Sequence, residues 1–252
     1  MFKLSKWYAD AVSAEGDVFV GYRARLESGP FSVSYAAVLD TAPCHSLGQT
    51  PLDIAEREIR WRAPSLGVEG RWQRTRDGLR ATIYECSDGI VAWHCLVPKG
   101  AATVQRPGRE PLTGLGYVEH LRLSVPPWRL PIRTLRWGRS HSARHSLIWI
   151  DWEGEFRARH VYRDGAAVAA DHVDDECVIL DNGSRLTLDR GLVLRHGTLG
   201  SSVLNAVPGI DRIAPARIFL TEECKWRSRA LLTRPGGETE EGWSIHEVVR
   251  WP

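Results

Sequence analysis

Two acidic residues stand among tryptophans and a histidine in the middle of the chain. Glu119 precedes His120, and Asp151 lies between Trp149 and Trp152 after an apolar run. A carboxyl group desolvated by apolar neighbours keeps its proton to higher pH and can act as a general acid. Asp151 is therefore a candidate proton donor. The plainer alternative, an exposed carboxylate at a strand end or in a turn, stays open.

The neighbours of these acids suggest supporting roles. In an extended segment, Tyr117 and Glu119 share one face and His120 points the other way. Trp137 would offer its π face to a developing cation. Arg139 would pair with Glu119 or Asp151 and hold the site in place, which is the usual role of a buried arginine.

The sequence gives no support for a cofactor or a metal ion. It has no Walker loop, no nucleophile elbow, no HExxH and no dinucleotide-binding glycine loop. His141 and His145 lie four residues apart near His120, but the loop-like context lacks the helix and third ligand that a zinc site needs. The five cysteines contain no CxxC pair, so reduced thiols are expected. We predict neither cofactor nor metal.

Composition narrows the class of partner. The 252 residues carry 33 basic and 31 acidic side chains, a balance that does not favour nucleic acid. No run of 18 apolar residues occurs, so no integral membrane segment is expected, whereas a peripheral membrane contact stays compatible with the sequence. The N-terminus lacks the apolar core of a signal peptide, which predicts a cytoplasmic protein. The sequence does not determine the oligomeric state.

The positioning elements are predicted to be strands. Alternation of apolar and polar residues, as from Val18 to Leu26, gives one buried and one polar face. Four turn signals bracket such segments: Asp77-Gly78, Asp88-Gly89, Asp164-Gly165 and Asn182-Gly183. The pattern predicts an all-β protein of two consecutive antiparallel barrel or sandwich domains, residues 1–125 and 126–252. The eleven tryptophans fill its cores or line a ligand cavity; both readings stay open.

Four stretches taken together resemble one family. They are WYADAVS at residues 7–13 with Gly16, GLGYVEH at 114–120, WGR at 137–139, and WID at 149–151. In order and approximate spacing they are similar to the WYxDAxSxDG, GxGYxDH, WGR and aromatic-x-Asp motifs of the carotenoid 1,2-hydratase (hydroxyneurosporene synthase) family and its lipocalin-like relatives.

This resemblance implies two lipocalin-like β domains with a long apolar cavity. It also implies hydration of an isoprenoid double bond without a redox cofactor. A carboxylic acid protonates the alkene, aromatic faces stabilise the cation, and water attacks. Asp151 would be the proton donor and His120 would handle the water. Tyr117, Glu119 and Trp149 would line the same site.

The chain departs from the family's pattern at two positions. Arg122 stands where the family has a tryptophan after its DH pair, and Trp149 stands where it has a tyrosine. The expectation is therefore a class of chemistry and not a carotenoid substrate.

Two functions follow as hypotheses. The first is a cofactor-independent acid/base enzyme on an apolar isoprenoid or polyene, of hydratase, cyclase or isomerase type. Its catalytic residues would be Asp151, His120 and Glu119, and its substrate-binding residues Tyr117, Trp137, Arg139 and Trp149. The alternative is a non-enzymatic lipocalin-like protein that binds a hydrophobic small molecule. A weaker third reading is an interaction protein whose core is filled by tryptophan.

Overall fold

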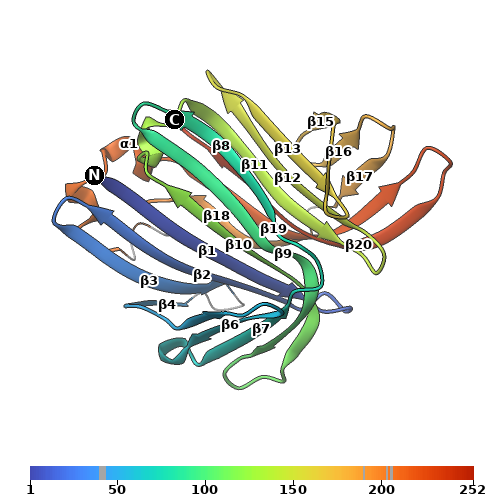
Figure 1. The fold of residues 1–252 in the computed structure, drawn as a ribbon, viewed down its shortest axis with the longest axis horizontal. Helices are drawn as coiled ribbons and strands as arrows, with labels where there is room; N and C mark the ends of the chain where they lie inside the picture. The colour runs from blue at the N-terminus through green and yellow to red at the C-terminus, as the bar shows by residue number, and fades with distance from the viewer. Residues whose placement is uncertain (40–43, 190, 203, 205–206) are drawn as a thin grey trace. The chain divides into compact units, whose positions relative to one another are not determined.

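The chain folds into two compact units, residues 1–130 and 131–252. The computed structural model describes residues 1–39, 44–189, 191–202, 204 and 207–252, and nearly all regular structure in it is β-strand (Figure 1). Each unit is built on one antiparallel sheet, so the predicted all-β, lipocalin-like class is confirmed. The unit border lies a few residues after the predicted border between residues 125 and 126.

Unit 1 is a ten-stranded sheet in the order β4-β3-β2-β1-β10-β9-β7-β6-β5, with β8 paired to β9. Its first and last strands, β1 and β10, are neighbours at the centre of the sheet. The strands are β1 (Phe2–Val12), β2 (Val18–Ser28), β3 (Phe31–Leu39), β4 (Cys44–Leu47), β5 (Leu52–Ile54), β6 (Glu58–Ala63), β7 (Val68–Gln73), β8 (Leu79–Cys86), β9 (Gly89–Gln105) and β10 (Leu112–Leu123). Short 3₁₀ turns occupy Pro64–Leu66 and Pro127–Arg129.

Unit 2 repeats this order as β14-β13-β12-β11-β20-β19-β17-β16-β15, with β18 paired to β19. Its strands are β11 (Ile132–His141), β12 (Ser146–Gly154), β13 (Ala158–Arg163), β14 (Ala166–Val168), β15 (Ala170–Val173), β16 (Cys177–Leu180), β17 (Arg185–Leu188), β18 (Leu192–Thr198), β19 (Glu222–Thr233) and β20 (Thr239–Arg250). A 3₁₀ turn, Ile210–Arg212, and helix α1 (Ala216–Phe219) precede β19. Each strand of unit 1 thus has a counterpart ten numbers later.

The turn residues explain where the hairpins fall. Asp164 and Gly165 both have positive φ, 54° and 91°, which suits the tight turn between β13 and β14. Gly183 at φ 80° joins β16 to β17, and Gly89 at φ 141° opens β9 after β8. These are three of the four predicted turns, and their positions are confirmed.

Tryptophan fills the core of unit 1. Trp61 and Trp72 are buried among small and branched apolar residues on one face of the sheet. Trp61 Nε1 donates to Thr50 Oγ1 at 2.8 Å, and Trp72 Nε1 donates to the Asp10 carbonyl at 2.7 Å. A Cβ at Gly21 would lie 2.3 Å from the Trp61 ring, so only glycine allows this approach. For these two tryptophans the core-filling reading is confirmed.

Unit 2 has its own core, in which Trp149 is central. Leu147 and Trp149 of β12 pack there against Val178, Leu186 and other buried residues. A Cβ at Gly138 of β11 would lie 2.2 Å from Trp149 Cζ2. Glycine at this position is therefore a packing requirement.

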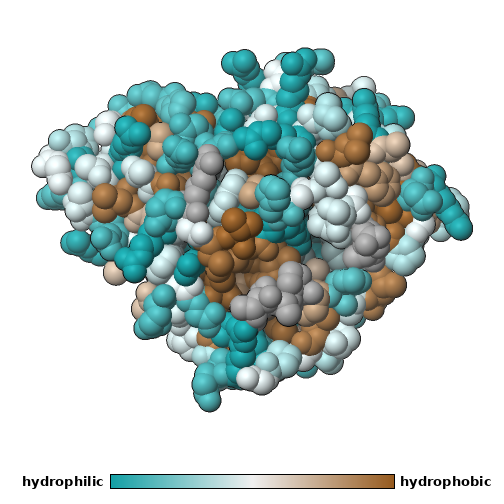
Figure 2. All heavy atoms as spheres, turned by 180° about the vertical axis from the view of Figure 1, so that it is seen from behind, coloured by the Kyte–Doolittle hydropathy of each residue, from teal (hydrophilic) through white to brown (hydrophobic). Residues whose placement is uncertain are grey.

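The molecular surface mixes polar and apolar side chains. Figure 2 shows hydrophobic residues gathered in patches among hydrophilic ones on one face. Large exposed apolar side chains include Leu192 and Val193 of β18. No helix in the described part of the chain has the length and apolar character needed to cross a bilayer.

Candidate functional site

Strand β10 carries two different sets of chemical groups on its two faces. Tyr117 and Glu119, two residues apart, share one face: the Tyr117 hydroxyl donates to Glu119 Oε2 at 2.6 Å. Trp93 Nε1 of β9 donates to the same oxygen at 2.5 Å. All three side chains are buried. The carboxyl group is thus enclosed by a phenol and an indole that both point their hydrogens at it.

Burial dominates the titration of this cluster. Burial raises the pKa of Tyr117 well above its usual value, and Cys95 and Glu119 raise it further. Burial also raises the pKa of the Cys95 thiol, and the Glu119 carboxyl adds to the effect. Both groups are therefore neutral at physiological pH. We call Tyr117, Glu119, Trp93 and Cys95 the carboxyl cluster.

Strand β1 extends the aromatic surroundings of the carboxyl cluster. Tyr8 pairs directly with Glu119 in the ladder, and its ring lies 6.0 Å from that of Tyr117. The Tyr8 hydroxyl donates to Asp10 Oδ2 at 2.8 Å. The β9–β10 ladder is irregular on both sides of Val118. Such bulges redirect side chains and are common beside functional sites.

The opposite face of β10 presents His120. Its ring stacks on Trp7, and its Nε2 lies 2.8 Å from Ser5 Oγ. Burial lowers the pKa of His120 to about 4, with smaller contributions from Arg122, His94 and Arg23. The imidazole is therefore neutral at physiological pH. The predicted opposite facing of Glu119 and His120 is confirmed.

Beside this histidine lies a hollow of about 120 Å³. Its walls come from β1, β2, β3 and the segment after β4. They are Ser5, Trp7, Arg23, Ala24, Arg25, Ser34, Gly48 and Gln49. Most of these side chains carry hydrogen-bond donors, set in walls whose exposed surface is mainly apolar. We call it the arginine hollow.

In unit 2, Asp151 forms ion pairs. Arg159 Nε lies 2.7 Å from Asp151 Oδ1, and Arg136 Nη1 lies 3.6 Å from Oδ2. Both arginines are cross-strand neighbours of Asp151, on β13 and β11. The two guanidinium groups hold the Asp151 side chain in place. This geometry suits an anchoring role better than proton donation.

Trp137 and Arg139 lie on the other face of β11 from Arg136. The Lys225 ammonium sits 4.8 Å from the centroid of the Trp137 ring and forms an ion pair with Glu247. The cation over this indole thus belongs to the chain itself. Arg139 is fully buried and donates to the Trp243 carbonyl at 3.0 Å. The expected pairing of Arg139 with Asp151 is replaced by Arg136, because strand alternation puts Arg139 on the opposite face.

The histidine arrangement of unit 1 recurs in unit 2. His246 of β20, the counterpart of β10, stacks on Trp226 with centroids 5.1 Å apart. Its Nε2 lies 2.9 Å from Ser228 Oγ. In both units the serine and the tryptophan are two residues apart on the strand next to the histidine. Each unit therefore contains a histidine that stacks on a tryptophan and lies within hydrogen-bond distance of a serine.

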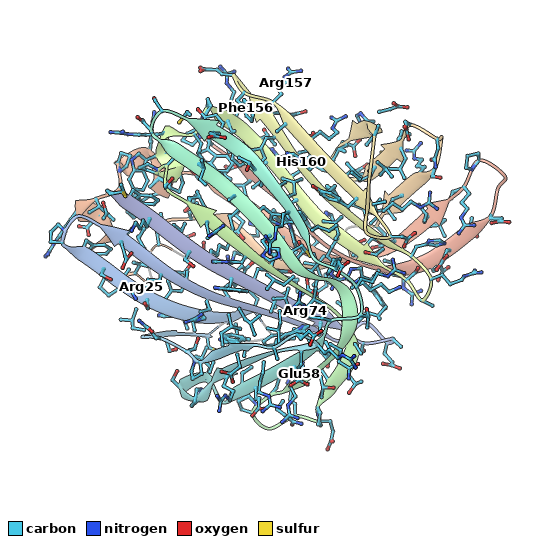
Figure 3. All side chains as sticks on the ribbon, in the orientation of Figure 1. Arg25, Glu58, Arg74, Phe156, Arg157 and His160 are labelled. Atoms are coloured by element: carbon cyan, nitrogen blue, oxygen red, sulfur yellow. The ribbon has the colours of Figure 1, made fainter. Side chains whose placement is uncertain are left out.

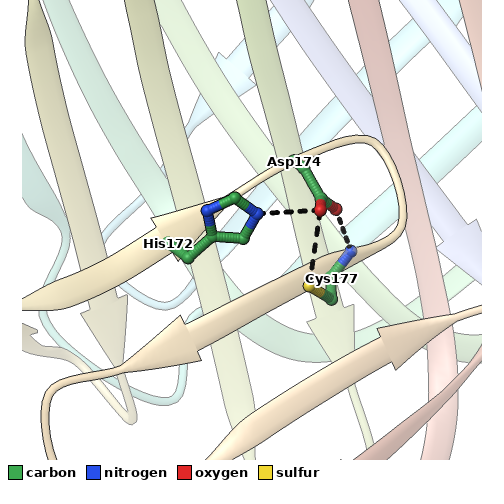
Figure 4. A group of neighbouring side chains, drawn as sticks. All are labelled: His172, Asp174 and Cys177. Atoms are coloured by element: carbon green, nitrogen blue, oxygen red, sulfur yellow. Dashed lines mark hydrogen bonds and ion pairs between the residues drawn. The ribbon is translucent and has the colours of Figure 1, made fainter.

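One group of side chains has the spacing of a metal site. His172, Asp174 and Cys177 lie around the β15–β16 turn, with ligand atoms within 4.8 Å of one another (Figure 4). Burial works to raise the pKa of Asp174, but hydrogen bonds from His172 and from the backbone N–H groups of Glu176 and Cys177 bring it to about 2. These hydrogen bonds belong to the β15–β16 turn, and the turn explains why the three side chains lie close together. His145, considered as a ligand from the sequence, pairs with Asp164 instead.

The structure brings some predicted site residues together and distributes others. Tyr117 and Glu119 form one cluster, and His120 occupies the other face of the same strand. The remaining four belong to unit 2: Trp137, Arg139, Trp149 and Asp151. Sequence reasoning missed Tyr8, Trp93, Ser5 and Arg23. The i, i+2 pattern of Ser5 and Trp7 was visible, but only strand pairing links it to His120.

No model of a known protein family matches the chain, and no curated protein sequence matches it. Solved structures do match. CghA with Sch210972 aligns over 99% of this chain and 89% of that chain, with a TM-score of 0.64 and 10% identity. Kievitone hydratase from Nectria haematococca aligns over 98% and 88%, with a TM-score of 0.56 and 8% identity.

A third solved structure is a putative AttH from Nitrosomonas europaea. It aligns over 97% of this chain and 92% of that chain, with a TM-score of 0.56 and 10% identity. The chain shares the fold of these proteins. At such low identity the likeness establishes architecture alone. The resemblance to carotenoid 1,2-hydratase stays a prediction.

Proposed function

We propose that the protein is a cofactor-independent acid/base enzyme that acts on an apolar isoprenoid or polyene. The reaction is of hydratase, cyclase or isomerase type. The observation that carries the proposal is the buried Glu119 carboxyl, which Tyr117 and Trp93 both approach through hydrogen bonds to Oε2. A carboxyl group held among aromatic rings is suited to protonate an alkene.

In this proposal the Glu119 proton is carried by one of its two oxygens. Because Oε2 already accepts two hydrogen bonds, a neutral carboxyl carries its hydrogen on Oε1. Transfer of that proton to an alkene carbon would leave a carboxylate, which the Tyr117 hydroxyl and the Trp93 indole stabilise through Oε2. In a hydration, water then adds to the carbocation and returns a proton to the site. In a cyclisation or isomerisation, the carbocation loses a proton instead.

The other predicted residues receive supporting roles in this proposal. The phenol rings of Tyr8 and Tyr117 provide π faces toward a cation. Asp151 is proposed to anchor Arg159 and Arg136, with which it forms two ion pairs. His120 is proposed to serve the opposite face of β10 and not to share a substrate with Glu119. The name of one protein with this fold, kievitone hydratase, agrees with a hydratase class.

The test is product analysis in heavy-oxygen water. Purified protein is incubated with a panel of isoprenoid alkenes and linear polyenes, and products are separated and weighed by mass spectrometry. Hydration adds one labelled water, whereas cyclisation or isomerisation leaves the mass unchanged and shifts the retention time. Glu119→Gln keeps the shape and should reduce turnover by about a hundredfold or more. Glu69→Gln is the matched control, because Glu69 is a half-buried carboxylate of unit 1 that forms an ion pair with Arg71. Full turnover in Glu119→Gln would exclude Glu119 as the acid.

A second function, a non-enzymatic carrier of a hydrophobic small molecule, is favoured by the ion pairing of Asp151. The acid first predicted as proton donor is occupied by two arginines. Extraction of the freshly purified protein with organic solvent, followed by mass spectrometry, tests this reading. A carrier would yield an intact compound that the protein leaves chemically unchanged during prolonged incubation.

A further inference from the structure

Arg23 of β2 is a half-buried cation with no carboxylate or carbonyl partner among the described residues. Among the residues that the structure describes, no hydrogen bond or ion pair engages its guanidinium. Burial lowers the pKa of Arg23. A guanidinium removed from water normally meets a carboxylate or carbonyl, because it presents five N–H donors. Arg23 instead lines the arginine hollow.

The register of the strands explains why basic side chains lie close to the arginine hollow. Arg23, Trp7, His120 and His94 follow one another across β2, β1, β10 and β9, so they share a row on one face of the sheet. The charges that lower the pKa of His120, after burial, are those of Arg122, His94 and Arg23. For His94, after burial, they are Arg80, Arg74 and Arg122. No carboxylate contributes to either histidine.

The other arginine of the hollow is already neutralised. Arg25, from the same strand (Figure 3), pairs with Glu27 at 2.6 Å. Of the two arginines in the hollow, Arg23 is thus the one with no carboxylate partner among the residues that the structure describes. A singly charged carboxylate matches it, whereas a phosphate group brings a larger negative charge. Ser5 and Ser34 add hydroxyl groups to the walls.

The surroundings of the hollow also indicate an organic ligand. Its walls include the indole of Trp7 and the buried Ala24. A smaller hollow, lined mainly by apolar side chains such as Leu52, Ile59 and Trp61, shares Trp7 and Arg23 with it. A ligand whose charged group meets Arg23 would therefore place its carbon atoms against apolar side chains.

We propose that the arginine hollow is a binding site for an organic carboxylate, with Arg23 as the group that holds the anion. The site lies on the opposite face of the sheet from Glu119, so it is distinct from the carboxyl cluster. The planar fork of Arg23 donates two parallel hydrogen bonds to the carboxylate. Ser5 and Ser34 donate further hydrogen bonds, and Trp7 covers the first carbons of the chain.

Calorimetric titration with three probes tests the proposal: hexanoate, the neutral hexanol of the same length, and inorganic phosphate. Hexanoate should bind saturably to the unaltered protein and much more tightly than hexanol or phosphate. Arg23→Gln should weaken hexanoate binding about tenfold or more, as expected for the loss of a charge-assisted hydrogen bond. Arg62→Gln serves as the control, because Arg62 is exposed and paired with Asp53.

Each outcome of the titration either supports or overturns the proposed carboxylate site. Equal binding of hexanol or phosphate, or unchanged hexanoate affinity in Arg23→Gln, overturns the assignment. So does the absence of hexanoate binding to the unaltered protein. A second measurement needs no variant: nuclear Overhauser contacts between hexanoate and the Trp7 indole place the ligand in the hollow. Contacts elsewhere in place of these would refute it. None of these readouts depends on turnover, so the carboxylate site and the proposed acid catalysis fail or stand separately.

Discussion

The imidazole of His120 lies nearly parallel to the indole of Trp7, with ring centroids 4.1 Å apart and an interplanar angle of 6°. This contact places a neutral histidine on the face of the sheet that carries Arg23. It also separates the two kinds of chemistry in unit 1. Glu119, one residue earlier, belongs wholly to the other face.

Folding stability should fall as the pH drops from 6.5 toward 4, in part through His120. Burial lowers the pKa of its folded form from 6.5 to about 4. The unfolded chain therefore takes up a proton first, and the penalty grows across this interval and is constant below it. Because the ring is only partly buried, the slope stays below the full ~1.4 kcal/mol per pH unit.

Urea denaturation across this pH range measures the effect. In His120→Gln the decline should be shallower, since the titrating group is gone. His94 has a pKa lowered in the same direction, so part of the decline persists. Identical pH profiles for the unaltered protein and His120→Gln would contradict the prediction.

Removal of the Tyr117 hydroxyl should destabilise unit 1. Tyr117→Phe leaves the buried Glu119 carboxyl with one donor fewer, at a cost of about 1–3 kcal/mol. Tyr84→Phe, at a partly exposed position on β8, should cost less than about 0.5 kcal/mol. Chemical denaturation of both variants gives the comparison. A Tyr117→Phe protein as stable as the unaltered one would mean that the hydroxyl contributes little to the cluster.

Gly138→Ala should be strongly destabilising, because the added Cβ would lie 2.2 Å from Trp149 Cζ2. Overpacking of this kind costs about 1–3 kcal/mol. Gly236→Ala is the matched control, since a Cβ there meets nothing within 4 Å. Thermal melts of the two variants should therefore differ clearly. Equal melting temperatures would show that the Trp149 core repacks freely.

Asp151 and Arg159 should be energetically coupled. A double-mutant cycle with Asp151→Asn and Arg159→Gln should give a coupling of about 1–2 kcal/mol, because Asp151 is almost fully buried while Arg159 is one-third exposed. The exposed pair Arg62–Asp53 provides a reference cycle, expected at about 0.5 kcal/mol. If the buried pair couples no more strongly than the exposed one, the anchoring role of Asp151 is refuted.

Local patterns in the sequence predict the fold class and the face of a strand on which each side chain lies. Aspartate, asparagine and glycine tolerate the positive φ that tight hairpin turns need, and such a turn forms at Asp164, whose φ is 54°. Tyr117 and Glu119 share a face because alternation is a property of a single strand. Such features depend on residues close in sequence.

The sequence does not predict features that depend on pairing between strands that are far apart in the chain. The sequence suggests that Arg139 pairs with Glu119 or Asp151, yet the register places Arg136 opposite Asp151 on one side and Arg159 on the other. Trp93 reaches Glu119 only because β9 pairs with β10. That Arg23 has no carboxylate partner among the described residues likewise emerges only from the folded chain.

The central pairing of each sheet joins the first strand of its unit to the last, as in the contact of Trp7 on β1 with His120 on β10. During synthesis on the ribosome, β1 therefore emerges long before its partner exists. A nascent chain that stops before Leu112 lacks β10, and β1 is left with one open edge that can pair with other chains. Almost all of unit 1 must leave the ribosome before β1 can pair with β10 at the centre of the sheet. This requirement slows folding, and a prematurely terminated chain cannot complete the sheet.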